Sequence, residues 1–305
     1  MSKVQINKLP IIRGTYKYNE PMSRHTWLGV GGAAEVMFEP EDETDLQYFM
    51  QHRPQEIPFF VLGGGSNLLV RDGGIKGVVI KLKNANFTKW RIVDNKFICG
   101  GGLVNFNLKK ILPQHNLGGL EFLCSIPGTI GGAFRSNAGC FGGELSQVLE
   151  KARVMNGHGE IFEVLAQDFH FAYRHSEFPE DWIILEAYLK TVIKSAVEIS
   201  AQIDQNDKYR KTHQPQGIKT AGSTFKNPPE QAAWKLIKAA GGAEMVEGGV
   251  RMSAQHCNFL DNDGTATAAE IETLGERIIT AVKAQSGVDL QWEVKRVGQY
   301  TNNDE

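Results

Sequence analysis

Glycine-rich loops that follow short apolar runs constrain this chain more than any other feature of its sequence. The run Phe59–Leu62 leads directly into Gly63-Gly64-Gly65-Ser66-Asn67, and a second loop reads Ile126-Pro-Gly-Thr-Ile-Gly-Gly-Ala133. Without a Cβ, neighbouring glycines let successive backbone N–H groups converge on an anion. Two such loops in adjoining parts of the chain favour a dinucleotide pyrophosphate as the ligand over two unrelated turns.

The common phosphate-binding signatures do not explain the first loop. GxxxxGK[ST] is absent from the chain, and Gly63–Leu68 lacks the third glycine of GxGxxG. Taken alone, the first loop has a tight turn as an equally good interpretation. The pairing with the second loop is what favours a ligand.

Composition excludes several classes of protein. Glycine supplies 33 of 305 residues and proline 11, without a repeat, which argues against collagen and linkers. Lys and Arg total 33 against 35 Asp and Glu, so no general field attracts nucleic acid or anionic lipid. The apolar stretch Phe122–Phe134 is too short for a membrane span and contains Pro127.

The compartment and the metal content are also constrained. The first twenty residues have scattered charges and lack the apolar segment of a signal peptide, which predicts a cytoplasmic protein. The four cysteines form no CxxC pair, and HExxH is absent, so we expect reduced thiols and no metal site. We expect a monomer that binds neither nucleic acid nor membrane.

Periodicity divides the first 203 residues into two α+β parts. In residues 1–85 the pattern predicts strands at Ala34–Phe38, Phe59–Leu62 and Gly77–Leu82, and a helix at Glu43–His52. In residues 86–203 it predicts strands at Lys96–Cys99 and Ile161–Leu165 and a helix at Asn105–Leu112. These two halves are expected to hold the ligand together.

Residues 204–305 predict a smaller α/β domain. The polar stretch Asp204–Gln216 is interpreted as a connection, and Gln231–Ala240 as a helix. Thr267-Ala-Ala-Glu270 is a capping box, followed by an apolar stripe that ends at Gly287: Ile271, Leu274, Ile278 and Val282. Alternation over Leu290–Val294 predicts a final half-buried strand.

Five motifs occur in order along the chain and span about residues 20 to 300. They are Phe60-Val-Leu-Gly-Gly-Gly-Ser-Asn-Leu-Leu-Val70, Ile126–Ala133 with Asn137-Ala-Gly139, Tyr173-Arg-His-Ser176, Gly222-Ser-Thr-Phe-Lys-Asn-Pro228 and Glu293-Val-Lys-Arg-Val-Gly298. Together they resemble the UDP-N-acetylenolpyruvoylglucosamine reductases, the MurB family, in its shorter second type.

The resemblance implies a fold and a cofactor. The fold is the two-subdomain FAD-binding fold of vanillyl-alcohol-oxidase-type flavoproteins plus a small C-terminal α/β substrate-binding domain. The implied reaction uses non-covalent FAD and NADPH to reduce an enolpyruvyl UDP-sugar in peptidoglycan precursor synthesis. The positions implied to contact FAD are Thr26, Gly31, Gly32, Gly63, Gly64, Gly65, Ser66, Asn67, Ile126, Pro127, Gly128, Thr129, Gly131, Gly132 and Asn137.

The resemblance also assigns three catalytic residues. Hydride delivery to an enolpyruvyl ether leaves negative charge delocalised into the neighbouring carboxylate. Arg174 is expected to bind and polarise that carboxylate with its two-pronged donor. Ser223 is expected to donate a proton to the α-carbon. Glu293 is expected to stabilise the enolate as a neutral acid, which requires desolvation or a nearby negative charge.

Taken without the resemblance, each of the three has a plainer interpretation. Arg174 would be a solvated surface arginine, Ser223 a turn residue before Asn-Pro, and Glu293 a solvent-facing residue of an alternating strand. The substrate contacts implied by the resemblance are Tyr173, Lys211, Gln214 and Asn227.

The chain departs from the family pattern in three places. Ala254 follows Ser253 where many relatives carry Glu, Glu244–Glu247 replaces a more glycine-rich or basic segment, and Lys295-Arg296 changes the charge of the last strand. These departures bear on substrate contacts. Two other functions stay open. One is an oxidase or dehydrogenase of small alcohols on the same fold, for which His25 and Cys124 are the candidate points of covalent flavin attachment. The other is a non-catalytic flavin- or nucleotide-binding protein.

Overall fold

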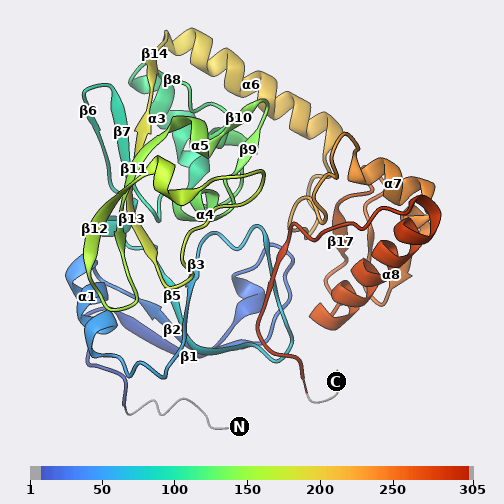
Figure 1. Ribbon diagram of the computed structural model, residues 1–305, viewed down its shortest axis with the longest axis horizontal. Helices are drawn as coiled ribbons and strands as arrows, with labels where there is room; N and C mark the ends of the chain where they lie inside the picture. Colours follow the sequence, from blue (N-terminus) through green and yellow to red (C-terminus); the bar gives the residue numbers. More distant parts are fainter. Residues whose placement is uncertain (1–7, 302–305) are drawn as a thin grey trace. The chain divides into compact units, whose positions relative to one another are not determined.

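The computed structural model describes residues 8–301 and contains both helices and strands throughout (Figure 1). The described chain divides into two compact units. The first comprises residues 8–18, 36–64 and 77–209, and the second comprises residues 19–35, 65–76 and 210–301. The boundaries between the two units fall within three strands and one helix, and also between Gly64 and Gly65.

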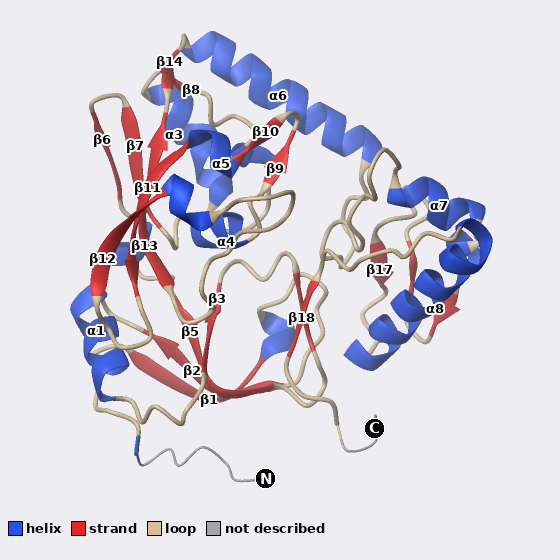
Figure 2. Ribbon diagram, in the orientation of Figure 1, coloured by secondary structure: helices blue, strands red, loops and turns tan. Residues whose placement is uncertain are grey.

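A four-stranded sheet has the order β1-β2-β5-β3 (Figure 2), and β3 runs parallel to β5. Its strands are β1 (Thr15–Pro21), β2 (Ala33–Glu39), β3 (Phe59–Leu62) and β5 (Ile75–Lys81). The helix α1 (Glu43–His52) connects β2 to β3, and its side chains Leu46, Phe49 and Met50 are buried. They pack in one core with Val36, Phe38, Val78 and Ile80.

A five-stranded antiparallel sheet of the first unit has the order β12-β11-β13-β7-β6. Its strands are β6 (Trp90–Val93), β7 (Lys96–Gly100), β11 (Leu149–Met155), β12 (Ile161–Leu165) and β13 (Ile183–Lys190). Two short pairs accompany it: β8 (Leu117–Gly118) with β14 (Val192–Ile193), and β9 (Gly139–Cys140) with β10 (Gly143–Glu144). The other helices of this part of the chain are α2 (Ala85–Thr88), α3 (Leu108–Gln114), α4 (Ile130–Arg135), α5 (Leu145–Val148) and α6 (Ala196–His213).

The second unit packs two helices, α7 (Ala233–Ala239) and α8 (Ala268–Ser286), against a small antiparallel sheet. That sheet has the order β15 (Val246–Glu247), β16 (Val250–Met252), β17 (Leu260–Asn262). A separate parallel pair joins β4 (Leu68–Val70) to β18 (Lys295–Val297). This pair brings the segment after the first glycine loop beside the end of the chain.

The predicted fold class is confirmed, and most predicted elements are present. The helix at Glu43–His52 and the strand at Phe59–Leu62 have the predicted bounds. Thr267 and Glu270 form the predicted capping box, and Gly287 ends α8 in the left-handed conformation at φ 72°. The four stripe residues of α8 are fully buried.

Two predicted segments are wrong. Asp204–Gln216 is no connection, because most of it lies in α6. This helix buries only Ile199, Ile203 and Asn206, so its sequence has almost no apolar stripe. The final strand is displaced to Lys295–Val297, since Leu290–Val294 makes only an isolated bridge at Trp292 to Phe225.

The capping box gives a stability prediction. Thr267→Ala removes the hydroxyl that accepts the Glu270 N–H at 3.1 Å, and we expect the free energy of unfolding to fall by about 1 kcal/mol. Urea denaturation measures the change. Thr280→Ala is the control, because Thr280 is exposed within α8 and its hydroxyl only donates back to the Glu276 carbonyl. An equal loss in both variants would show that the cap does not stabilise α8.

Candidate active site

The two predicted glycine loops lie against each other in the first unit. A Cβ on Gly64 would lie 2.7 Å from the Cα of Gly128, and a Cβ on Gly63 would lie 3.1 Å from Oγ1 of Thr129. Thr129 is the N-cap of α4, and its hydroxyl accepts the Gly132 N–H at 3.3 Å. The contact therefore requires the absence of a side chain at Gly64, and Gly128 has φ +119°, a conformation that favours glycine.

A cavity of about 210 Å³ lies beside these loops in the first unit. Gly63 and Gly64 line it, as do Thr129, Gly131 and Gly132. The other lining residues include Gly101, Gly102, Lys81, Lys83, Arg135 and Trp182. The predicted residues Ile126 and Pro127 are half-buried in the turn before Gly128, where the Ile126 carbonyl accepts the Asn105 side-chain N–H at 3.1 Å.

Basic side chains at the cavity suit a diphosphate. Arg135 donates to the carbonyls of Glu180 and Trp182, and its guanidinium lies 4.7 Å from the centre of the Phe178 ring. Burial lowers the pKa of Arg135, which still carries its charge at neutral pH. Lys83 pairs with Glu39 at 2.7 Å. The cavity thus combines glycine backbone with basic side chains.

Sequence reasoning missed Gly100–Gly102, Lys81, Lys83 and Arg135. The glycine triplet could have been found, because it follows the predicted strand Lys96–Cys99 as Gly63–Gly65 follows Phe59–Leu62. The Gly101 carbonyl accepts the Gly131 N–H at 2.8 Å, so the triplet is hydrogen-bonded to the second glycine loop. The basic residues carry no local signal.

Of the remaining predicted FAD positions, Asn137 lies in the first unit, and Thr26, Gly31, Gly32, Gly65, Ser66 and Asn67 lie in the second unit. The Thr26 hydroxyl donates to the Val30 carbonyl at 2.8 Å. Gly31 has φ +126°, and a Cβ on Gly32 would lie 2.1 Å from the Asp72 carbonyl oxygen. Gly65 has φ +64° and a Cβ there would lie 1.8 Å from the His25 carbonyl oxygen. These glycines serve close backbone packing, and Ser66 is half-buried beside them.

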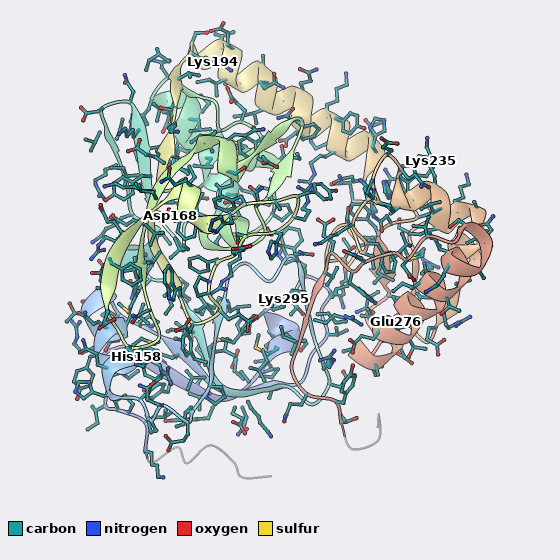
Figure 3. All side chains as sticks on the ribbon, viewed as in Figure 1. His158, Asp168, Lys194, Lys235, Glu276 and Lys295 are labelled. Carbon is teal, nitrogen blue, oxygen red and sulfur yellow. The ribbon has the colours of Figure 1, made fainter. Side chains whose placement is uncertain are left out.

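Asn67 connects the first glycine loop to Glu293. Its side-chain amide donates to the Glu293 carbonyl at 3.1 Å, and its main-chain carbonyl accepts the Lys295 N–H at 3.2 Å. Lys295, labelled in Figure 3, begins β18, which continues parallel to β4. Asn67 thereby fixes the backbone on both sides of Val294, including the backbone of Glu293.

Ser223 and Glu293 lie on neighbouring pieces of backbone in the second unit. The Glu293 N–H donates to the carbonyl of Thr224 at 2.8 Å, and Ser223 forms a bridge with Phe259. Both Ser223 and Glu293 are half-buried. Gly222, with φ +80°, turns the chain just before the serine. The structure thus brings together two of the three predicted catalytic residues.

Arg174 lies in the first unit at the tip of a tight turn. Ala172 and His175 exchange backbone hydrogen bonds of 3.0 and 3.1 Å on either side of it. Arg174 has φ +53°, a left-handed conformation that costs a non-glycine residue of the order of 1 kcal/mol. Its guanidinium donates to the Gly139 carbonyl at 2.7 Å and lies 5.0 Å from the centre of the Tyr173 ring.

Asn137 supports that turn. Its side chain is fully buried, donates to the Ala172 carbonyl at 3.1 Å and accepts the Ser146 N–H at 3.0 Å. The Asn137-Ala-Gly139 motif therefore holds Arg174 from two positions, through Ala172 and through Gly139. A direct contact of Asn137 with FAD stays a prediction.

The predicted substrate contacts differ in their surroundings. Tyr173 is 50% exposed. Lys211 is exposed on the last turn of α6, and the Gln214 side chain accepts from Nε of Arg210 at 2.8 Å. Asn227 is exposed, and its side-chain oxygen Oδ1 accepts the Ala233 N–H at 3.0 Å at the start of α7.

Comparison with known proteins places this arrangement in a family. A model described as FAD binding domain matches residues 34–165, and one described as UDP-N-acetylenolpyruvoylglucosamine reductase, C-terminal domain, matches residues 214–297. A UDP-N-acetylenolpyruvoylglucosamine reductase from Azorhizobium caulinodans is 44% identical over 95% of this chain and 94% of that protein. The chain belongs to the UDP-N-acetylenolpyruvoylglucosamine reductase family.

Other members agree over the same length. A reductase of this name from Maricaulis maris is 41% identical over 97% of this chain and 96% of its own. The crystal structure of the MurB reductase from Thermus caldophilus matches with a TM-score of 0.80 and 32% identity, over 94% of this chain and 99% of that chain. The predicted family and the predicted FAD-binding fold are confirmed.

The residues of the first unit fit the cofactor of this family. The two glycine loops leave backbone uncovered at the cavity, and basic side chains line it. The side-chain nitrogen of Asn105 donates to the Ile126 carbonyl. The side-chain oxygen of the same residue is buried and has no hydrogen-bond partner among residues 8–301. The glycine backbone and the basic side chains at the cavity suit a diphosphate. Across the described part of the chain, no helix has the length and apolar character needed to span a membrane.

Gly132 provides a test of the cavity as the FAD site. A Cβ on Gly132 would approach only Oγ1 of Thr129, at 3.6 Å, so the protein without flavin tolerates Gly132→Ala. The added methyl group would occupy ligand space, and we expect FAD affinity to fall about tenfold or more, or ~1.4 kcal/mol. Titration of the flavin-free protein with FAD measures it.

Ser136→Ala is the matched control, because Ser136 ends the same helix and its hydroxyl bonds to the Gly132 and Ala133 carbonyls. It should keep the wild-type FAD affinity. If Gly132→Ala binds FAD normally, the second loop does not contact the cofactor.

Proposed function

We propose that this chain reduces UDP-N-acetylenolpyruvoylglucosamine to UDP-N-acetylmuramate in peptidoglycan precursor synthesis, with non-covalent FAD and with NADPH as the reductant. Membership of the reductase family supports the reaction. The observation that carries the assignment of residues is the hydrogen bond of 2.8 Å from the Glu293 N–H to Thr224, the residue after Ser223. We further propose that the enzyme works in the cytoplasm as a monomer.

FAD, when bound, supplies hydride transfer from NADPH to the terminal carbon of the enolpyruvyl group. The substrate then carries negative charge shared between its α-carbon and its carboxylate. The protein must hold that charge and deliver one proton to the α-carbon. Ser223, Glu293 and Arg174 divide these tasks.

Ser223 is the proton donor. Its hydroxyl follows a left-handed glycine and stands on backbone that is hydrogen-bonded on both sides, which suits donation to a fixed carbon. The alkoxide that remains regains a proton from water or through Lys226, which is half-buried three residues later. A nucleophilic role would need a neighbouring base and a GxSxG elbow, and the sequence offers neither.

Arg174 and Glu293 stabilise the charge. The guanidinium of Arg174 binds the substrate carboxylate, held by its bond to Gly139 and by the Tyr173 ring. Glu293, in its protonated form, donates a hydrogen bond to the enolate oxygen. Tyr173, Lys211, Gln214 and Asn227 are proposed to contact the sugar nucleotide. The FAD positions named from the resemblance, from Thr26 to Asn137, are proposed as contacts of the cofactor.

Flavin absorbance under anaerobic conditions tests the function in one cuvette. NADPH should bleach the absorbance, and UDP-N-acetylenolpyruvoylglucosamine added afterwards should restore it. A non-catalytic flavin- or nucleotide-binding protein predicts either no bleaching or no recovery. An alcohol oxidase predicts recovery with oxygen and none with the enolpyruvyl substrate.

Ser223→Ala separates the two half-reactions. Bleaching by NADPH should proceed at the wild-type rate, because that step needs no proton from Ser223. Recovery with the enolpyruvyl substrate should slow by about 10²- to 10⁴-fold, the usual contribution of a positioned acid. Ser286→Ala, at the end of α8, is the control and should change neither rate. Equal loss of both rates in Ser223→Ala would contradict the assignment.

Non-covalent binding of flavin distinguishes this enzyme from an oxidase with attached flavin. Cys124 is fully buried, and burial raises the pKa of its thiol to about 12, so no thiolate is present at neutral pH. His25 lies with Nε2 at 2.8 Å from a Glu20 oxygen. We expect all yellow colour to pass through a filter that retains the unfolded chain. Colour kept with the chain would contradict this.

A further inference from the structure

The side chain of Asn258 binds the backbone next to Ser223. Its amide oxygen accepts the Phe225 N–H at 3.0 Å, and its amide nitrogen donates to the Phe225 carbonyl at 2.8 Å. Asn258 is 3% exposed and Phe225 is fully buried. The amide thus pairs with Phe225 as one strand residue pairs with another.

The main chain of Asn258 adds to this contact. Its carbonyl accepts the Thr224 N–H at 2.8 Å, and the next residue, Phe259, forms the bridge with Ser223. The Asn258 N–H in turn donates to Nδ1 of His256 at 3.2 Å. Burial lowers the pKa of His256, so the ring is neutral at pH 7 and can accept that bond.

The opposite edge of the same segment binds the backbone of the segment Gln291–Glu293, which precedes β18. The Thr224 carbonyl accepts the Glu293 N–H at 2.8 Å, and the Lys226 N–H donates to the Gln291 carbonyl at 2.8 Å. The serine segment therefore lies between Asn258 on one side and Glu293 on the other. Asn258 is the only one of these partners that acts through a side chain, among the hydrogen bonds described for residues 8–301.

We propose that Asn258 is a positioning residue that holds Ser223 in register with Glu293 for the reduction of the enolpyruvyl group. This inference rests on the proposed roles of those two residues. The buried amide matches both polar groups of Phe225, so the serine segment has one well-defined position along the backbone of Gln291–Glu293. Without it, the Phe225 N–H and carbonyl are buried unpaired, and the segment moves to satisfy them.

The geometry predicts a selective kinetic effect. Displacement of a proton donor by about 1 Å costs about 10²-fold in rate. We therefore expect Asn258→Ala, as the full FAD-loaded protein, to slow the recovery of flavin absorbance by the enolpyruvyl substrate about 10²-fold. Bleaching by NADPH should keep the wild-type rate, and KM for the enolpyruvyl substrate should change little. A variant that slows both steps in proportion would overturn the proposal.

Asn262→Ala is the matched control. Asn262 is also 3% exposed, and its side chain also bonds to backbone, at Leu28, Gly264 and Ala266. It should lower thermal stability as much as Asn258→Ala without the selective loss of the substrate step. The same selective loss in both variants would mean that any buried asparagine of this unit has the effect, and Asn258 would hold no special position.

Asn258→Asp keeps the test decisive if the alanine variant fails to bind FAD. The carboxylate keeps the shape and the acceptor for the Phe225 N–H, and it loses the donor to the Phe225 carbonyl. The same selective loss is expected. Wild-type rates in both half-reactions would overturn the proposal.

A double-mutant cycle shows whether Asn258 acts through Ser223. In the Ser223→Ala background, Asn258→Ala should cost much less than its 10²-fold effect in the wild type, because the group it positions has already been removed. Full additivity would overturn the positioning role. If Ser223→Ala alone leaves recovery at the wild-type rate, the proposed function of Ser223 fails, and this result is distinct from a failure of Asn258.

Discussion

The close approach of backbone at Gly64 and Gly128 is the constraint on which the proposed FAD site depends. A single methyl group on Gly64 would lie 2.7 Å from the opposite Cα, well inside van der Waals contact. The loops can therefore approach this closely only with glycine at position 64, and glycines of both loops line the cavity. Gly101 extends this arrangement to a third loop through its bond to the Gly131 N–H.

The residues proposed to be catalytic are held by asparagine side chains more than by helices or regular strands. Asn137 holds the turn of Arg174, Asn67 holds the carbonyl of Glu293, and Asn258 pairs with the residue two after Ser223. An asparagine amide carries the donor and the acceptor of a peptide group, so it can pair with irregular backbone where no strand is available. That chemistry allows Arg174, Ser223 and Glu293 to lie on loops whose backbone is nevertheless held in place.

The local sequence predicted the helices that have a recognisable cap or a regular spacing of apolar residues. Glu43–His52 has a clear N-cap at Asp42, and α8 has both a capping box and a continuous apolar stripe, so each was visible in isolation. The helix α6 was not visible, because only Ile199 and Ile203 face a core and the other positions are polar. Among its polar residues, Asp207 pairs with Lys109 and accepts a hydrogen bond from Ser125, and periodicity does not encode such contacts.

The candidate site residues also differ in whether the local sequence reveals them. Glycine loops carry a physical signal, because consecutive glycines after an apolar run have few other uses, and the overlooked triplet Gly100–Gly102 obeys the same rule. Arg174, Ser223 and Glu293 carry no such signal, and only the resemblance identified them. Asn258 lies 35 residues from Ser223 in sequence, so its pairing with Phe225 becomes visible only when the chain is folded. A residue that positions another residue is recognised by the hydrogen bonds it makes in the folded protein. For the segment that carries Ser223, these are the bonds to Asn258 on one side and to Glu293 on the other.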